Sequence, residues 1–239
     1  MALALIGGTG LDNLQGLVLK DTHVLDTHYG SISVPVQEGD YHGQQVMFLA
    51  RHGHEHSVPP HQINYRANIW ALHELGVHNV IASAAVGAIN SLMKPADVVI
   101  ANQIVDYTWG REHTFFEYGH GPLQRVHHID FTEPYSENLR HSLIHAAEIA
   151  KIPFHDRGVC GVTQGPRLET ASEINRMERD GCDIVGMTTM PEASLARELN
   201  MKYATCAFVI NPAAGRGNNI SEEIETYLER GANNMRTLI

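Results

Sequence analysis

Five runs of hydrophobic residues, rich in Val, Ile, Ala and Leu, are spaced along the chain. They are continuous stretches, and this pattern is typical of β-strands that are buried on both faces of a sheet. Each run is short enough for a strand and is followed by polar residues or glycine. We therefore predict strands over residues 2–6, 45–50, 79–85, 97–105 and 203–210.

Between these runs, apolar residues recur at helical spacing. In residues 61–76 they fall near one helical face, and the pattern stops at Gly76, a residue that favours the end of a helix. Similar patterns predict helices over 136–151, 169–181 and 191–200. Since strands alternate with helices, we expect an α/β fold with a central, largely parallel or mixed sheet flanked by helices.

The chain of 239 residues has the length of one large α/β domain. It contains no internal repeat, low-complexity tract or Gly/Ser linker, so we expect a single domain over residues 1–239. The stretch from Asp106 to Glu133 is rich in His, Gly and aromatic residues and lacks periodicity. Such a long aperiodic stretch indicates a functional or interface loop.

The net charge of the chain indicates which class of molecule it binds. The formal net charge of -10 and the pI near 5.8 argue against a nucleic-acid or anionic-membrane surface, so small molecules are the expected partners. The three cysteines form no paired spacing, which is typical of reduced thiols. We find neither a signal peptide nor an apolar segment of membrane-spanning length, and we expect a cytoplasmic protein.

The sequence IGGTGL follows the first predicted strand directly. Its glycines allow successive backbone N–H groups to turn toward one point, beside the Thr9 hydroxyl, which predicts an anion site. An ordinary tight turn is the alternative. A dinucleotide site would need a helix straight after the glycines, but the chain breaks at Gly16 and then alternates like a strand, so we exclude nicotinamide cofactors.

The sequence RHGHEH places His52, His54 and His56 at alternate positions. In an extended chain these side chains share one face and could bind zinc. Arg51, however, is a permanent cation that suits a phosphate better than a divalent metal. We expect no metal, and His52 is assigned to the anion while His54 and His56 receive no role.

Two further segments favour an oxyanion. Thr188 comes just before the helix that Pro191 opens, where a hydroxyl and backbone N–H groups meet the positive end of the helix. Simple N-capping by Thr188 is the alternative. The small-residue strand end at 83–87 is the other segment. The ends of parallel strands meet at one edge of a sheet, where such folds bind ligands.

Two polar residues have the chemistry to bind a heterocycle. Glu169 stands at a helix start after a Gly-Pro turn, and Asn211 ends the last predicted strand. Taken singly, Glu169 is explained as a carboxylate at a helix N-terminus, and Asn211 as a turn former before Pro212. Together they match a 6-oxopurine, which offers N1–H to a carboxylate and O6 and N7 to an amide.

These motifs stand in one order with LARHGHEH, NYRANIWAL, GPRLETASE and DIVGMTTMPEASLARE. The chain thereby resembles, over nearly its whole length, the trimeric purine nucleoside phosphorylase and methylthioadenosine phosphorylase family. The resemblance implies one α/β domain in a homotrimer, with ribose packing on Met187 and His128 reaching the 5′ group across the trimer interface. It implies phosphate contacts at Thr9, Arg51, His52, the backbone of Ala84 and Ala85, and Thr188.

Departures from the family pattern concern the base. Methylthioadenosine phosphorylases carry aspartates where this chain has Asn211 and Ala213, and a serine where it has Glu169. An aspartate facing O6 would repel it, whereas an amide can donate to it, so the pattern is that of 6-oxopurine enzymes. The GGTG start and RHGHEH nonetheless belong to the methylthio branch. The base-binding pattern of 6-oxopurine enzymes and the motifs of the methylthio branch together predict phosphorolysis of 5′-methylthioinosine.

The expected reaction is direct displacement, in which bound phosphate attacks C1′ of an oxocarbenium-like ribosyl group. Asn211, Glu169 and His52 are the expected catalytic residues, and Ile220 and Ile224 are candidates for the 5′ pocket. Inorganic phosphate is a co-substrate, and no cofactor is expected. The alternatives are a general inosine and guanosine phosphorylase, a methylthioadenosine phosphorylase, a metal-dependent hydrolase and a nucleoside-binding protein without catalysis.

Overall fold

The computed structural model describes residues 2–117, 122–123 and 125–239. Its centre is an 11-stranded mixed sheet whose main path has the order β10-β8-β13-β7-β1-β6-β5-β2, with β12, β11 and β9 branching from β7. Strands β6, β1, β7 and β13 pair in parallel, so their carboxyl ends lie at the same edge. The bounds are β1 Ala2–Gly7, β2 Val18–His23, β5 Val36–Tyr41, β6 Gln44–Ala50, β7 Val77–Ala88, β8 Val98–Ile100, β9 Gln103–Asp106, β10 Phe154–His155, β11 Val159–Val162, β12 Ile184–Gly186 and β13 Lys202–Pro212, with a separate small sheet of β3 Asp26–Thr27 and β4 Gly30–Ser31.

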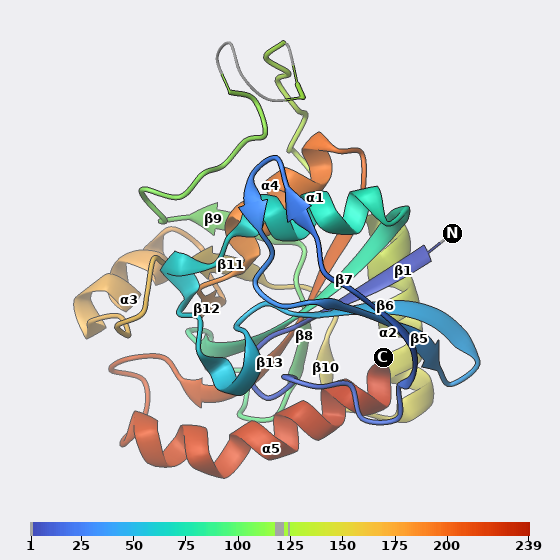
Figure 1. Ribbon diagram of the computed structural model, residues 1–239. Coiled ribbons are helices and arrows are strands. Elements are labelled where there is room, and N and C mark those ends of the chain that lie inside the picture. Colours follow the sequence, from blue (N-terminus) through green and yellow to red (C-terminus); the bar gives the residue numbers. More distant parts are fainter. Residues whose placement is uncertain (1, 118–121, 124) are drawn as a thin grey trace.

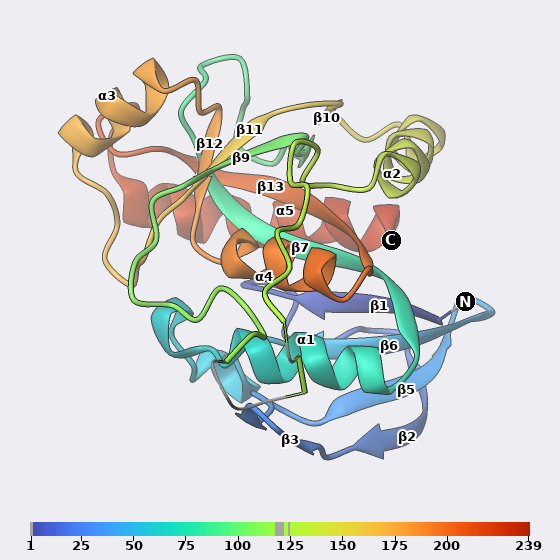
Figure 2. The same cartoon turned by 90° about the horizontal axis from the view of Figure 1, so that it is seen from above.

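Helices cover both faces of this sheet (Figures 1 and 2). In Figure 1, α1 and α4 lie above the sheet, and α5 lies below it. Alternate residues of β13 pack on opposite sides, with Cys206 and Phe208 facing α2 and α5, and Ala207 and Val209 facing the core under α1 and α4. The helices are α1 Tyr65–Glu74, α2 Glu137–Ala150, α3 Ala171–Arg179, α4 Thr189–Glu198 and α5 Ile220–Leu238, with short 3₁₀ turns at His54–His56 and Pro60–Gln62.

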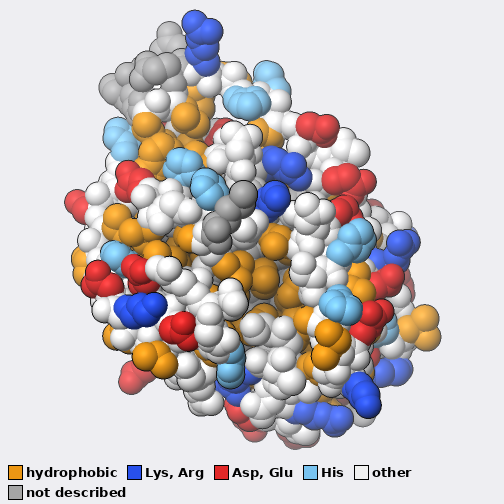
Figure 3. Space-filling view, turned by 90° about the vertical axis from the view of Figure 1, so that its right-hand side faces the viewer, with side chains coloured by type: hydrophobic (Ala, Val, Ile, Leu, Met, Phe, Trp, Pro, Cys, Tyr) orange, Lys and Arg blue, Asp and Glu red, His pale blue; other side chains and the backbone are white. Residues whose placement is uncertain are grey.

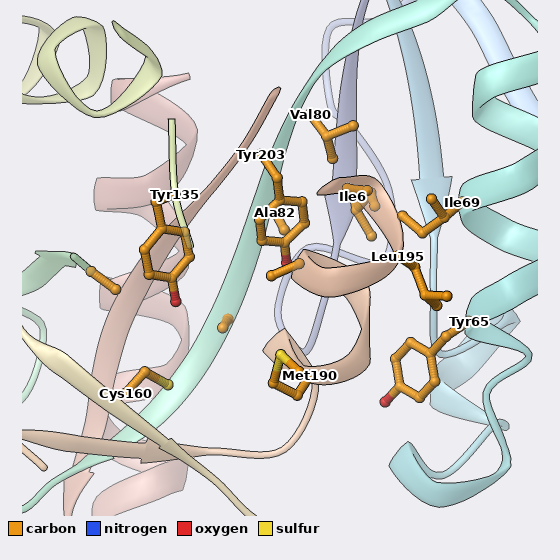
Figure 4. Packing of buried hydrophobic residues seen from close by; sticks show 14 of the residues in the cluster. Ile6, Tyr65, Ile69, Val80, Ala82, Tyr135, Cys160, Met190, Leu195 and Tyr203 are labelled. Carbon is orange, nitrogen blue, oxygen red and sulfur yellow. The ribbon is translucent and has the colours of Figure 1, made fainter. Parts of the chain in front are cut away.

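The largest core lies between the sheet and the α1–α4 pair. Figure 4 shows Leu195 of α4 beside Ile69 of α1, with Ile6 and Val80 of the sheet to their left. All four side chains are buried, so water is excluded from the helix-sheet boundary. Helix α4 therefore has little freedom to move relative to the strand ends, and the residues that precede it are held in place.

The α/β fold with a mixed sheet agrees with the sequence prediction, and two element boundaries were wrong. The strand predicted over 97–105 is two strands, because β8 pairs with β13 and β10 whereas β9 pairs with β11. The helix predicted over 61–76 begins at Tyr65, since the Asn64 side chain accepts from the Ala67 backbone N–H and caps it there. Gly76 has a φ of 76°, as expected for the residue after a helix.

The surface in Figure 3 carries interspersed acidic, basic and histidine side chains, with hydrophobic side chains gathered toward its middle. On this face the described side chains form no continuous basic stripe. Within the described part of the chain, no helix combines the length and the apolar character needed to cross a membrane.

Candidate active site

A cavity of about 360 Å³ opens at the edge where the parallel strands end. Strands β1, β6, β7 and β13 each contribute residues at or near their carboxyl ends. Strand β12, which runs antiparallel to β7, contributes Val185 and Gly186, and Met187 follows directly. The cavity lining includes twelve of the predicted site residues, Thr9, Arg51, His52, Ala84, Ala85, Glu169, Met187, Thr188, Asn211, Ala213, Ile220 and Ile224.

The glycine turn after β1 forms one wall. The Leu11 N–H donates to the Gly8 carbonyl, which closes a tight turn, and the Gly8 N–H donates to Ser83 Oγ at 2.9 Å. The Gly8 N–H is therefore not free to bind an anion, contrary to the expectation that successive N–H groups converge on one point. A Cβ at Gly8 would lie 2.6 Å from Arg51 Nη1, so this glycine is needed to let the guanidinium approach.

Arg51 is only 1% exposed and is held on three sides. Its Nε and Nη2 donate to the two carboxylate oxygens of Glu192, at 2.6 and 3.2 Å, and Nη1 donates to the Ser83 carbonyl at 2.7 Å. A guanidinium carries five N–H donors, so two remain available. Sequence reasoning missed Glu192; its signal was a carboxylate within the otherwise apolar start of a helix.

His52 is a neutral side chain in this environment. Burial and the adjacent Arg51 charge lower its pKa from 6.5 to about 3. Its Nδ1 lies 2.9 Å from the Val58 carbonyl, and because a carbonyl only accepts, Nδ1 carries the proton. Nε2 is therefore an acceptor. The His56 ring stacks on His52 with 4.2 Å between centroids.

The histidine run does not have the extended geometry that a shared face requires. Strand β6 ends at Ala50, and Glu55 and His56 have φ values of 53° and 57°. The premise of three imidazoles on one face of a strand was therefore wrong. The His54 side chain lies outside what the structure describes. Within the described residues, the three-membered group with metal-ligand spacing is Asp21, His23 and Glu38, on β2 and β5.

Thr188 precedes α4 without capping it. Its side chain makes no capping hydrogen bond, although it is only 7% exposed. Met190 has extended φ and ψ values, so the regular helix begins at Pro191, as the sequence predicted. The hydroxyl is thus left for a ligand, which argues against the simple capping alternative.

Glu169 and Asn211 also line the cavity. The Thr163 hydroxyl donates to Glu169 Oε1 at 2.6 Å, which leaves Oε2 toward a ligand. Asn211 Nδ2 donates to the Pro212 carbonyl at 2.6 Å, so its second N–H and its own oxygen remain. Ala213 adds no charge here. The sequence did not point to Thr163, because a lone threonine just after a short strand gives no signal.

A third part of the cavity is apolar. Ile220 and Ile224 line it from the first two turns of α5, and Pro59 and Pro60 line it as well. His128 is the predicted residue that does not line the cavity: it is exposed, in the segment between β9 and α2. The described part of a single chain therefore leaves the 5′ end of the cavity without this histidine.

The known sequences that this chain resembles are nucleoside phosphorylases. Residues 2–239 match the family model described as Phosphorylase superfamily. A probable S-methyl-5′-thioinosine phosphorylase from Pseudomonas syringae pv. tomato is 52% identical over 238 residues, covering 99% of this chain and 96% of the relative. A 6-oxopurine nucleoside phosphorylase from Pyrococcus furiosus is 50% identical over 215 residues, covering 89% and 80% of the two chains.

Solved structures agree. A double mutant of adenosine/methylthioadenosine phosphorylase from Schistosoma mansoni, crystallised with adenine, superimposes with a TM-score of 0.93 at 33% identity. The match covers 99% of this chain and 88% of that one. The mixed sheet and its flanking helices are thus the fold of this structure also.

Proposed function

Because the chain belongs to the Phosphorylase superfamily and is a nucleoside phosphorylase, we propose that its substrate is 5′-methylthioinosine. Phosphate and the nucleoside react to give hypoxanthine and 5-methylthioribose 1-phosphate. The relatives at about 50% identity that are named as probable S-methyl-5′-thioinosine phosphorylases support this substrate.

The observation that carries the proposal is the pairing of Glu169 with Asn211 at the base end of the cavity. With Oε1 held by Thr163, Glu169 has Oε2 to accept N1–H of a 6-oxopurine. Asn211 has one N–H left to donate to O6 or N7. A 6-aminopurine has no proton on N1 and would leave the partly buried Glu169 carboxylate facing a lone pair, which is costly.

The other end of the cavity supplies the phosphate site. The two remaining N–H donors of Arg51 and the Thr188 hydroxyl face it, with Thr9 and the Ala84 and Ala85 backbone beside them. Neutral His52 offers Nε2 as an acceptor, which suits the P–OH group of monohydrogen phosphate. A site that combines donors with one acceptor recognises this protonated oxyanion.

Catalysis follows from this arrangement. Bound phosphate attacks C1′ as the glycosidic bond lengthens and negative charge grows on N7 and O6 of the base. Asn211 stabilises that charge and Glu169 fixes the purine, so most of the rate comes from positioning and electrostatics. Met187 packs against the ribose, and Ile220 with Ile224 contacts the methylthio group.

A general inosine and guanosine phosphorylase is the second candidate. It is favoured by the relatives named 6-oxopurine nucleoside phosphorylase, a name that specifies no 5′-methylthio group. The side chains that this chain contributes to the 5′ end favour methylthioinosine, because Ile220, Ile224 and Pro60 offer a 5′-hydroxyl no side-chain hydrogen bond.

We also propose that the chain is one phosphorylase domain that assembles as a homotrimer. Strands from both ends of the sequence pair in one sheet, which supports a single domain. His128 lies outside the cavity of its own chain, which fits a role in the 5′ pocket of a neighbouring subunit. Sedimentation equilibrium tests the trimer, and a monomeric mass with full activity contradicts it.

The substrate is tested by phosphate-dependent release of hypoxanthine from 5′-methylthioinosine, measured beside adenine release from 5′-methylthioadenosine and hypoxanthine release from inosine. A higher kcat/KM for methylthioinosine supports the proposal. Preference for methylthioadenosine contradicts the roles of Glu169 and Asn211. Preference for inosine leaves the base assignment standing and contradicts the 5′ assignment.

A further inference from the structure

Arg111 lies outside the cavity but contacts three segments that form its walls. It follows β9 in the long segment after Asp106 and is partly buried. Its Nη1 donates to the carbonyls of Met187 and Met190, at 2.7 and 2.6 Å. Its Nη2 donates to the carbonyls of Thr163 and Gln164, at 3.2 and 2.8 Å, and its Nε to the Gln164 side chain at 3.1 Å.

These acceptors belong to opposite halves of the site. Met187 and Met190 flank Thr188, which lines the cavity and is the residue proposed to bind phosphate. Thr163 holds the Glu169 carboxylate at the base end. One guanidinium thus joins the backbone that carries the phosphate contact to the backbone that orients the base contact, although the two are more than twenty positions apart in sequence.

Arg111 is also connected, through Tyr65, to the cavity wall that contains Pro60. Arg111 Nη1 also lies 3.3 Å from the Tyr65 hydroxyl, and the guanidinium stacks 5.3 Å from the centroid of that ring. The Tyr65 hydroxyl in turn donates to the carbonyl of Pro60, which lines the cavity. The five N–H donors of the guanidinium all point to oxygen atoms, and none of these hydrogen bonds is to a carboxylate.

We propose that Arg111 is a positioning residue that sets the distance between the phosphate-binding and base-binding halves of the active site. The inference rests on the proposed function, because it assigns Thr188 to phosphate and Glu169 to the purine. The planar fork of a guanidinium matches carbonyls arranged around it, whereas a lysine has three donors on a flexible stem and cannot span the same set. A shift of about 1 Å between reacting groups costs on the order of 100-fold in rate.

The test compares Arg111→Lys, Arg111→Gly and a matched control, Arg140→Gly. Arg140 is a buried arginine that, like Arg111, donates to main-chain carbonyls, those of Ala101 and Asp156. It also pairs with Glu137, lies on α2 and does not line the cavity. Phosphate and nucleoside are varied separately, using whichever nucleoside the unsubstituted enzyme converts fastest. Thermal unfolding is recorded for every variant, and the assays are repeated with millimolar guanidinium chloride.

We expect Arg111→Gly to lower kcat about 100-fold and to raise KM for both phosphate and nucleoside, with at least a tenfold recovery in guanidinium. Arg111→Lys should raise both KM values to a smaller degree. Arg140→Gly should lower Tm, keep both KM values and show no recovery. Such behaviour distinguishes positioning from a loss of folded protein, which lowers kcat alone.

The proposal is overturned if folded Arg111→Gly keeps both KM values of the unsubstituted enzyme. If the glycine variant does not fold, unchanged KM values in Arg111→Lys overturn it equally. A preference of the unsubstituted enzyme for inosine or methylthioadenosine would refute the proposed substrate without deciding the Arg111 question, because the comparison then proceeds with that nucleoside.

Discussion

The guanidinium of Arg51 and the carboxylate of Glu192 form a buried ion pair with 2.6 Å between Nε and Oε1, although the residues are 141 positions apart. The Tyr203 hydroxyl donates to the second carboxylate oxygen at 2.8 Å. The pair fixes which N–H groups of Arg51 face the cavity. It also balances a charge that would otherwise be buried alone.

Glu192→Gln should therefore destabilise the protein and weaken phosphate binding. Removing one partner of a buried ion pair leaves an uncompensated charge, which costs about 3–5 kcal/mol in the free energy of unfolding. Urea denaturation measures this. Glu229→Gln is the control, because Glu229 pairs with Arg236 at an exposed site and its loss should cost less than about 1 kcal/mol. Equal losses in the two variants would contradict the buried pair's role.

His52 should make the unliganded protein less stable as the pH falls. Its folded pKa of about 3 lies below its ordinary value of 6.5, so the unfolded chain binds the proton more readily. Stability is retained above about pH 6.5 and is lost below it, by roughly 1.4 kcal/mol per pH unit until the folded pKa is reached.

The measurement is urea unfolding at pH 7 and pH 5 for the unsubstituted protein and for His52→Asn. Asparagine can keep a donor near the Val58 carbonyl but does not titrate. The loss of stability between the two pH values should be roughly 2 kcal/mol smaller in His52→Asn. Parallel losses would show that His52 is not buried neutral.

Thr188→Ala should affect phosphate affinity much more than stability. Its hydroxyl makes no capping hydrogen bond, so the loss of stability should be about 0.8 kcal/mol, the value for one buried methyl group, and Thr188→Val, which keeps a methyl group there, should lose less. The KM for phosphate should rise about tenfold, and Thr188→Ser should restore it. In contrast, Thr170 caps α3 through the Glu173 backbone N–H, so Thr170→Ala should cost about 1 kcal/mol. A stability loss of about 1 kcal/mol in Thr188→Val, which loses the hydroxyl but not the methyl group, would restore the capping interpretation.

Asn211→Asp should discriminate against 6-oxopurines. A carboxylate beside O6 repels the charge that grows on the leaving base, so kcat/KM for methylthioinosine should fall by about 100-fold or more. Asn211→Ala removes the donor without adding repulsion and should lose less. The test is which variant has the lower kcat/KM for methylthioinosine. A higher kcat/KM in Asn211→Asp than in Asn211→Ala would contradict the proposed contact.

Ile224→Ser should reduce the preference for a 5′-methylthio group over a 5′-hydroxyl. Losing apolar contact with one methyl-sized group costs about 1–3 kcal/mol, so kcat/KM for methylthioinosine should drop about tenfold. The value for inosine should change less, because serine can contact its hydroxyl. Equal losses for both nucleosides would place Ile224 outside the 5′ pocket.

The sequence identified several cavity residues because they follow strongly hydrophobic strands. Thr9, Arg51 and Asn211 come at or just after the ends of β1, β6 and β13, and parallel pairing brings those ends together. Boundaries were less accurate where pairing changed partner, as between β8 and β9. Short strands such as β11 and β12 were missed, since a three- or four-residue run carries no periodicity.

By itself, the sequence determined the α/β class, the order of the motifs and the residue types available for phosphate and purine, because these depend on local hydrophobic pattern and side-chain chemistry. Only the tertiary structure decided which groups remain free to act. It engaged the Gly8 N–H with Ser83, kept His52 neutral by burial, left Thr188 uncapped and joined Arg51 to Glu192. Hydrogen-bond partners and desolvation depend on contacts between distant segments, and no local pattern contains them.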